Sequence, residues 1–173
     1  MKEILKYLYK LRADNPDTGG YAYKAQTRDI AVVELLFATG IRVSELCELS
    51  CDAVDLKEAT IKVFGKGSKE RVIQICSVEV LKILRQYQRL FAPSKCFFIN
   101  RLGNRLSSQS VRLLIKRCRE EIGIGKKITP HTFRHTFATL LLEEDVDIKY
   151  IQNLLGHSSI TTTQIYTCLL YTS

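Results

Sequence analysis

The sequence has no long apolar run and no CxxC pair of cysteines. Charged side chains at Lys2, Glu3 and Lys6 interrupt its first apolar stretch, whereas a signal peptide or a membrane span needs an unbroken one. We therefore expect an intracellular protein of the cytoplasm with no membrane partner. The six cysteines form no CxxC pair, and without a secretion signal this pattern predicts reduced thiols.

Two common kinds of phosphate chemistry also lack their residues. The glycine-rich segment at residues 65–68 does not have the spacing of a nucleotide-binding P-loop, and no acidic cluster could hold the two metal ions of a nuclease. Cys47 and Cys51 could share a metal ion, but no second Cys or His pair nearby completes a tetrahedral site, so core packing explains them better. P-loop nucleotide hydrolysis and two-metal nuclease chemistry are thus excluded.

What the sequence does have is positive charge and enough apolar residues for one core. The 173 residues include 26 Lys and Arg against 18 Asp and Glu, a net charge of +8, and 46% are hydrophobic. No repeat, low-complexity segment or linker divides the chain, so we expect residues 1–173 to form a single domain. The excess of positive charge favours a polyanionic partner such as nucleic acid, although solubility alone could also account for it.

Hydrophobic spacing predicts a mostly helical α+β domain. Apolar side chains recur at helical intervals in seven segments, at residues 3–12, 27–39, 42–49, 78–91, 107–122, 129–141 and 148–155. A final helix, capped by Ser158 or Ser159, is expected to carry Tyr166. Alternating apolar residues over 59–75 predict a β-hairpin with a lysine at its turn, and Phe97–Ile99 predict a short strand.

Several side chains suited to phosphate chemistry stand at the expected ends and turns of these elements. They are Arg42, Lys66, His131, Arg134, His157 and Tyr166. His131 and Arg134 are three residues apart, about 60° around a helix, so both can face one site near the positive N-terminal end of that helix. Two arginines could grip the non-bridging oxygens of a phosphate with their planar guanidinium groups.

Each of these residues also has an ordinary structural explanation. Arg42 could simply pair with Glu45 on a helix surface, and a lysine between glycines is usually a solvated turn. A histidine more often packs than catalyses, and packing is the role we expect for His135, which points elsewhere on its helix. Taken singly, none of these residues predicts a function, so their order and spacing must decide.

Four motifs in a fixed order give the sequence a specific resemblance to a known family. They are ATGIRVSEL (residues 38–46), GKGSKER (65–71), HTFRHTFAT (131–139) and LLGH (154–157), the last followed by Tyr166 nine positions after His157. From about Thr27 to Thr167 the chain resembles the tyrosine recombinase, or phage integrase, family, in particular its Xer-like bacterial members. The resemblance implies the catalytic-domain fold of that family, with a small antiparallel hairpin or three-stranded sheet.

The resemblance also implies a DNA strand transfer that needs neither ATP nor a metal ion. Tyr166 would attack a DNA phosphodiester and form a 3′-phosphotyrosyl link, which a 5′ hydroxyl can later reverse. Arg42 and Arg134 would hold the scissile phosphate. Lys66 would bind the DNA as well and protonate the departing 5′ oxygen. The remaining implied site residues are His131 and His157, which would hydrogen-bond the phosphate, and Glu45, which would support Arg42.

Both ends of the chain depart from the usual pattern of the family. We expect the N-terminal core-binding domain that clamps DNA to be absent before Thr27, and residues 168–173 to be a truncated tail or a cloning scar. The expected partner is double-stranded DNA. We expect a synaptic tetramer on DNA for the intact enzyme and a monomer for this chain, with weak and salt-dependent binding.

Three functions fit the resemblance. The leading one is site-specific recombination, in integration and excision of a mobile element or in resolution of chromosome dimers, and the sequence does not choose between these two. A type IB topoisomerase would relax supercoils by the same tyrosine chemistry, but the motifs are those of recombinases. A catalytically weak DNA-binding or regulatory remnant would keep the fold without turnover, and the complete set of expected catalytic residues argues against it.

Overall fold

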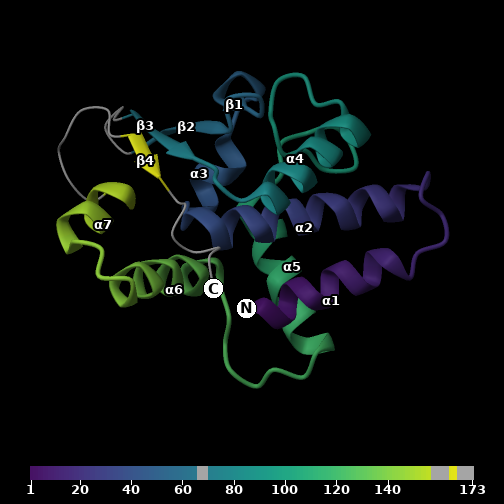
Figure 1. Cartoon of the computed structure of the whole chain (residues 1–173). Helices are drawn as coiled ribbons and strands as arrows, with labels where there is room; N and C mark the ends of the chain where they lie inside the picture. Colours follow the sequence, from purple (N-terminus) through teal and green to yellow (C-terminus); the bar gives the residue numbers. More distant parts are fainter. Residues whose placement is uncertain (66–69, 157–163, 167–173) are drawn as a thin grey trace.

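The computed structural model describes residues 1–65, 70–156 and 164–166, and only the backbone of the last three. Helices dominate it, and one small sheet lies against them (Figure 1). The α-helices are α1 (Lys2–Ala13), α2 (Tyr21–Thr39), α3 (Val43–Glu48), α4 (Val78–Phe91), α5 (Ser108–Glu121), α6 (Pro130–Glu143) and α7 (Ile148–Leu154). The strands are β1 (Val54–Asp55), β2 (Thr60–Phe64), β3 (Glu70–Gln74) and β4 (Gln164–Tyr166), and a short 3-10 helix at Cys51–Ala53 precedes β1.

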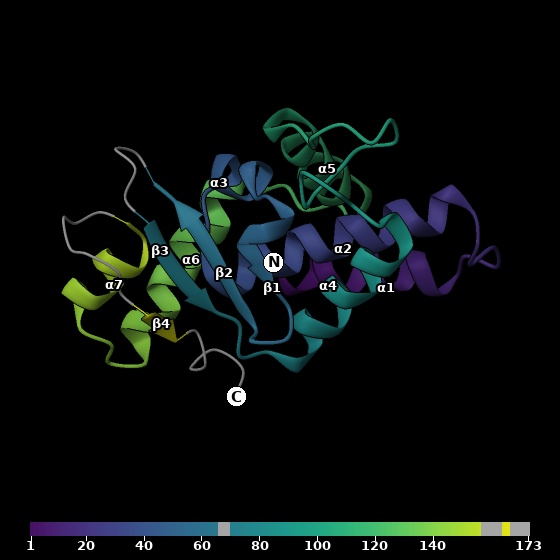
Figure 2. The same ribbon diagram turned by 90° about the horizontal axis from the view of Figure 1, so that it is seen from above.

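The long helix α2 forms the centre of the core. Its buried residues, from Thr27 to Thr39, lie on every side of the helix because α1, α4 and α6 pack around it. A helix that is covered on all sides is apolar all round rather than along one stripe. Figure 2 shows α1 and α4 beside α2, with the sheet toward one end of the molecule.

Most helix boundaries agree with the hydrophobic spacing and the caps. Helix α4 occupies the predicted residues 78–91, and side-chain oxygens of Ser107, Thr129 and Asp147 accept backbone N–H groups at the starts of α5, α6 and α7. Helix α2 begins earlier than predicted, at Tyr21, because the turn residues end at Gly20 and good helix formers follow at once. None of the described helices combines the length and the apolar character needed to cross a membrane.

Gly40 ends α2 at a position that only glycine fits. Its φ is +59°, and its N–H donates to the carbonyl of Leu36 at 3.1 Å. A Cβ here would lie 2.5 Å from Cδ1 of Phe137, which is too close for any side chain. The chain therefore turns sharply against α6 and starts α3 three residues later, at Val43, with Arg42 as its N-cap.

The sheet has the strand order β1-β2-β3-β4. Its first three strands are antiparallel, and Ile61 pairs with Ile73 in the β2–β3 hairpin, as the alternating pattern predicts. Ile61 and Val63 are buried while Lys62 and Phe64 are exposed, because successive side chains of a strand point to opposite faces. The predicted α+β class with a small antiparallel sheet is confirmed.

Strand β4 corrects the prediction of a final helix that carries Tyr166. Residues 164–166 extend the sheet as a parallel neighbour of β3, with Tyr166 opposite Gln74. The β-branched Ile165 and the aromatic residue after it both favour an extended strand. Their pairing with β3 joins segments that lie far apart in the sequence, so a local pattern could not reveal it.

The predicted strand at Phe97–Ile99 is also wrong. Isolated β-bridges at Cys96 and Ile99 stand in its place. Phe97 and Phe98 are both fully buried, whereas a strand with one face on the core would bury only every second residue. This aromatic segment fills the core and is not a sheet element.

Two predictions about single side chains are wrong as well. His135 is exposed and does not pack, because Phe133 and Phe137 occupy the core face of α6 on either side of it. Cys76 is disulfide-bonded rather than a reduced thiol, since the approach of two thiols depends on the fold and not on their spacing in the sequence. The free thiols of the described residues are Cys47, Cys51, Cys96 and Cys118.

Candidate active site

A cavity of about 300 Å³ lies between the start of α3 and the start of α6. It brings together three residues that the sequence separates widely, Arg42, His131 and Arg134. A larger cavity of about 420 Å³ between α2 and α5 holds the ion pair of Arg28 and Asp29 and none of the predicted site residues, so the smaller cavity is the candidate site. The other residues that line the smaller cavity are Ile41, Val43, Ser44 and Pro130.

Arg42 reaches this cavity from the N-terminus of α3. Its backbone N–H donates to Oε2 of Glu45 at 3.0 Å, and its Nη1 donates to Oε1 of the same carboxylate at 2.9 Å. This arrangement resembles a capping box, in which the third helical residue reaches back to the N-cap. These two bonds hold Arg42 in place. Because 37% of its side chain is exposed, the guanidinium is still open to a ligand.

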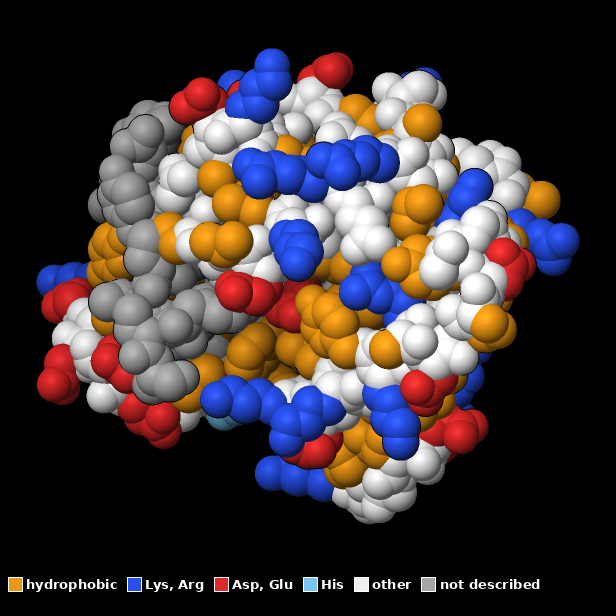
Figure 3. All heavy atoms as spheres, turned by 45° about the vertical axis from the view of Figure 1, so that its right-hand side comes forward, with side chains coloured by type: hydrophobic (Ala, Val, Ile, Leu, Met, Phe, Trp, Pro, Cys, Tyr) orange, Lys and Arg blue, Asp and Glu red, His pale blue; other side chains and the backbone are white. Residues whose placement is uncertain are grey.

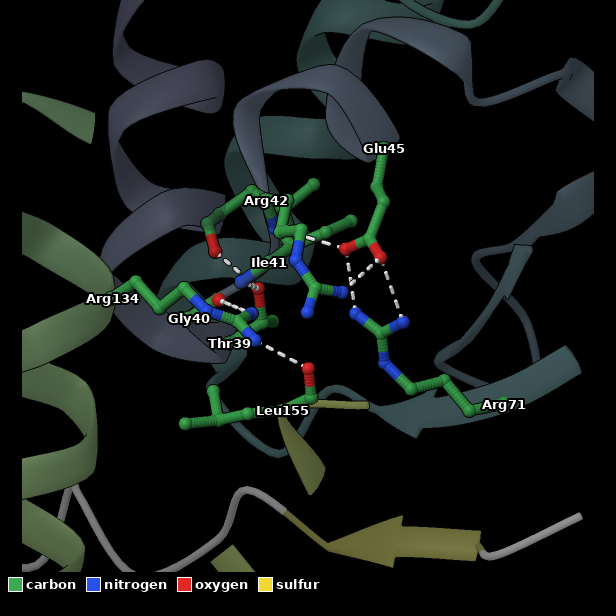
Figure 4. Close-up of polar contacts among 9 residues, drawn as sticks. Thr39, Gly40, Ile41, Arg42, Glu45, Arg71, Arg134 and Leu155 are labelled. Atoms are coloured by element: carbon green, nitrogen blue, oxygen red, sulfur yellow. Dashed lines mark hydrogen bonds and ion pairs between the residues drawn. The ribbon is translucent and has the colours of Figure 1, made fainter. Parts of the chain in front are cut away.

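Arg134 reaches the cavity from α6 and is buried. Its Nη1 donates to the carbonyl of Gly40 at 2.7 Å, and its Nη2 donates to the carbonyl of Leu155. These two carbonyls end α2 and α7, so one guanidinium ties three helices together (Figure 4). Burial lowers the pKa of Arg134 to about 10, and the nearby charge of Arg42 adds to this effect. The group still carries its charge at neutral pH.

Glu45 is the acceptor that links Arg42 to a second arginine, Arg71 on β3. Arg71 donates from Nη1 to Oε1 at 3.0 Å and from Nη2 to Oε2 at 2.7 Å, and both side chains are buried. Burial alone would raise the pKa of Glu45, but the hydrogen bonds and charges of Arg71 and Arg42 outweigh it and lower that pKa. The carboxylate is therefore ionised at neutral pH.

Arg71 pairs with Glu45 beside the candidate site and was not singled out from the sequence. A signal for it exists in the alternation of β3, because Arg71 falls on the same face as the buried Ile73 and Ile75. A charged residue at an inward position needs a partner, since an unpaired buried charge is very unfavourable. That partner is Glu45, which could not be named from the strand alone.

His131 lies in the first turn of α6 and is exposed at the rim of the cavity. Thr129 caps this helix and Pro130 occupies its first position, as predicted. The aligned peptide dipoles make the start of a helix electropositive, so it favours an anion. Among the described residues, no group of His, Cys, Asp and Glu side chains is arranged to hold a metal ion.

Three of the predicted site residues are not placed by the structure at the side-chain level. Lys66 and His157 lie outside the described residues, and of Tyr166 only the backbone, in β4, is described. The predicted helix caps Ser158 and Ser159 lie outside the described residues too. The structure thus brings Arg42, His131 and Arg134 together and leaves the positions of the other three side chains as predictions.

Gly156 presses the end of α7 against the two arginines. Its φ is +71°, and a Cβ on it would lie 3.2 Å from Nη1 of Arg71 and 3.5 Å from Nη1 of Arg42. The backbone just before His157 therefore runs directly over both guanidinium groups. Glycine suits this position because it adopts the left-handed conformation without strain and leaves room for the close approach.

One face of the molecule carries many Lys and Arg side chains. On the face drawn in Figure 3, Lys and Arg side chains spread around a hollow that has apolar side chains on its floor. Lys62, on the exposed side of β2, contributes to a smaller cavity beside Glu45 and Phe64. Such a distribution suits a ligand that carries many negative charges.

Comparison with known proteins identifies the family. The sequence profile of the phage integrase family matches residues 13–172, so the chain belongs to that family. The chain is 49% identical over 171 residues to a tyrosine recombinase of Agathobacter rectalis, a match that covers 96% of this chain and 55% of the relative. It is 48% identical over 149 residues to tyrosine recombinase XerC of Thermodesulfovibrio yellowstonii, covering 81% of this chain and 50% of the relative.

Solved structures share the fold. A crystal structure of XerA recombinase superposes with a TM-score of 0.74 at 33% identity, over 92% of this chain and 56% of that one. The catalytic core of lambda integrase superposes with a TM-score of 0.67 at 22% identity, over 94% of this chain and 96% of that one, which shows a common fold. The chain spans about half the length of the curated relatives it matches.

Proposed function

We propose that this chain is the catalytic domain of a site-specific DNA recombinase, which cleaves and rejoins DNA through a covalent bond to Tyr166. The observation that carries the proposal is the cavity that Arg42, His131 and Arg134 line together. Two guanidinium groups and an imidazole at the positive end of a helix form a set suited to a phosphate diester. Membership of the phage integrase family supports the same chemistry.

In the proposed cleavage step, the phenol oxygen of Tyr166 attacks the scissile phosphorus. A phenol has a pKa of about 10 in water, so it becomes a nucleophile only where positive charge favours the phenolate. Arg42 and Arg134 supply that charge and neutralise the charge that develops on the non-bridging oxygens. His131 and His157 donate hydrogen bonds to the same oxygens.

The same step releases a 5′ hydroxyl. The bond between phosphorus and the 5′ oxygen breaks as the bond to Tyr166 forms, and Lys66 gives its proton to the departing oxygen. The phosphotyrosyl link keeps a phosphodiester's bond energy, so a 5′ hydroxyl of another strand can attack it and restore a DNA strand. The proposed chemistry uses only side chains of this protein.

The proposed partner is double-stranded DNA. Among structures of the same fold, XerH has been solved with its difH substrate and a lambda integrase dimer with a COC′ core site. The proposal treats residues 1–173 as one catalytic domain, with double-stranded DNA bound over the Arg42 cavity. In the intact enzyme we propose a tetramer on DNA, and for this chain alone a monomer.

Trapping the covalent adduct tests the proposal. The substrates are nicked duplexes that tile the DNA flanking the gene, because the short strand beyond the nick diffuses away and cannot reverse cleavage. We expect wild-type protein to form an adduct that survives denaturation, Tyr166→Phe to form none, and the matched control Tyr171→Phe to retain it.

Three outcomes would contradict this proposal. An adduct in Tyr166→Phe would show that another residue is the nucleophile. DNA binding without an adduct on any duplex of the set would indicate a DNA-binding remnant. Relaxation of supercoiled plasmid that lacks every cleaved sequence would indicate a topoisomerase.

A further inference from the structure

Two arginines share one carboxylate beside the candidate site. Glu45 accepts hydrogen bonds from both Nη atoms of Arg71, and from Nη1 and the backbone N–H of Arg42 (Figure 4). Arg71 takes a two-point grip, whereas the side chain of Arg42 makes a one-point contact. The two arginines come from different elements, since Arg71 lies on β3 and Arg42 caps α3.

The two-point grip fixes the orientation of the carboxylate. A fork of two parallel N–H···O bonds defines both the distance and the rotation of its partner, while a single bond leaves rotation free. Glu45 can then accept only two bonds from Arg42, from Nη1 at Oε1 and from the backbone N–H at Oε2. Within the described part of the chain, the Nε and Nη2 atoms of Arg42 make no hydrogen bond, so they can face a ligand in the cavity.

Loss of Arg71 would change this geometry without removing any group that touches the phosphate. Glu45 is buried and ionised, so it would turn toward its one remaining cation, Arg42. A two-point pair between Glu45 and Arg42 would then use the nitrogen atoms that the phosphate needs. Arg71 also lies against Gly156, so it supports the backbone that leads to His157.

We propose that Arg71 is a positioning residue for DNA cleavage, which acts through Glu45 to keep the guanidinium of Arg42 directed at the scissile phosphate. The inference rests on the proposed function. Two other roles are possible for a buried arginine on β3. It could stabilise the fold alone, or it could hold β2 and β3, between which Lys66 lies in the sequence.

The test measures the single-turnover rate of adduct formation on a duplex that wild-type protein cleaves. The variants are Arg71→Met, Arg71→Lys, Glu45→Gln and the double variant Arg71→Met with Glu45→Gln. Arg85→Met is the matched control, because Arg85, like Arg71, joins two segments of the fold through its guanidinium, here by a bond to the carbonyl of Leu56 at 2.8 Å, and does not line the cavity. The thermal unfolding midpoint and the dissociation constant for the DNA are measured for each protein.

A second substrate carries sulfur in place of the 5′ bridging oxygen. A thiolate leaves without a proton, so this substrate does not need a general acid, whereas its non-bridging oxygens still need Arg42. We expect Arg71→Met to slow cleavage by roughly 10- to 100-fold on both substrates, since a displacement of about 1 Å can cost about 100-fold. Arg71→Lys keeps the charge but not the fork, so it should rescue only part of the rate.

The double variant separates positioning from folding. The neutral amide that Glu45→Gln introduces no longer attracts Arg42, so the double variant should cleave several-fold faster than Arg71→Met although it lacks the same ion pair. Cleavage by Arg71→Met at the wild-type rate would overturn the inference. A double variant no faster than Arg71→Met would overturn it too, as would a loss of rate in Arg85→Met that matches its loss of stability. Full recovery of the Arg71→Met rate on the sulfur substrate would also overturn it and would assign Arg71 to the hairpin. Absence of an adduct in wild-type protein would instead contradict the proposed function.

Discussion

Glu45 and Arg71 form a buried two-point ion pair, with Oε1 and Nη1 at 3.0 Å and Oε2 and Nη2 at 2.7 Å. The pair joins α3 to the sheet at the edge of the candidate site. The pair keeps the buried carboxylate of Glu45 ionised, and the stability of the fold depends on that ionisation.

Glu45→Gln should therefore change the pH dependence of stability. The pKa of Glu45 is lowered from its ordinary value of 4.5. Its ionised form therefore stabilises the fold at pH values above 4.5, and the protein loses this stability as the pH falls through the lower folded pKa. We expect the variant to be about 3 kcal/mol less stable at pH 7. Urea unfolding from pH 7 to pH 3 should show the difference shrinking below about pH 4.5, and two parallel curves would contradict the prediction.

Arg134→Met should destabilise the fold much more than Arg42→Met. Arg134 satisfies the carbonyls of Gly40 and Leu155 in the interior, so its loss leaves buried acceptors and should cost about 3 kcal/mol. Arg42 is partly exposed and Glu45 keeps Arg71 as a partner, so Arg42→Met should cost about 1 kcal/mol or less. Chemical denaturation measures both, and adduct assays should show that both variants lose cleavage. Equal stability of the two variants would contradict the structural role assigned to Arg134.

Arg42→Met should also reduce the salt dependence of DNA binding. Each phosphate contact releases bound counterions, so loss of one contact should lower the slope of log K against log salt by about 1. Binding titrations between low and moderate salt measure that slope. Arg85→Met, which removes a charge outside the cavity, should leave it unchanged, and a similar drop in both variants would indicate a general charge effect.

The sequence predicts most of the helices because their boundaries depend on local signals. Caps at Ser107, Thr129 and Asp147 and the periodicity of 78–91 determine helix boundaries that the structure confirms. The parallel pairing of β4 with β3 escaped prediction, since it depends on contacts between distant segments. The same limit explains the error at Cys76, whose disulfide depends on tertiary structure.

Only the part of the candidate site that lies in sequence motifs was predictable. Arg42, His131 and Arg134 follow from order and spacing, and the structure places them around one cavity. The bonds of Arg134 to two helix ends and the grip of Arg71 on Glu45 were not predictable, because each depends on where a distant backbone or side chain lies. The catalytic roles of Arg42, His131 and Arg134 remain predictions.

Gly156 offers a test of how tightly the end of α7 must fit the arginines. Its φ of +71° is matched by Gly123, whose φ is also +71°. The two glycines differ in surroundings, because a Cβ at 156 would meet the guanidinium of Arg71 at 3.2 Å, whereas a Cβ at 123 would meet nothing within 4 Å. Replacement by alanine therefore costs the same backbone strain at both positions, about 1 kcal/mol.

The difference between Gly156→Ala and Gly123→Ala isolates the contact. The methyl group at 156 must push Arg71 and the following backbone apart, so we expect a larger loss of stability than at 123 and a fall in the rate of adduct formation of roughly tenfold or more. Gly123→Ala should cleave at the wild-type rate, because Gly123 does not line the cavity and its added methyl group meets no neighbour within 4 Å. Single-turnover rates of the two variants at equal fraction folded decide the matter: equal rates would show that the approach of Gly156 to the arginines has no bearing on the chemistry.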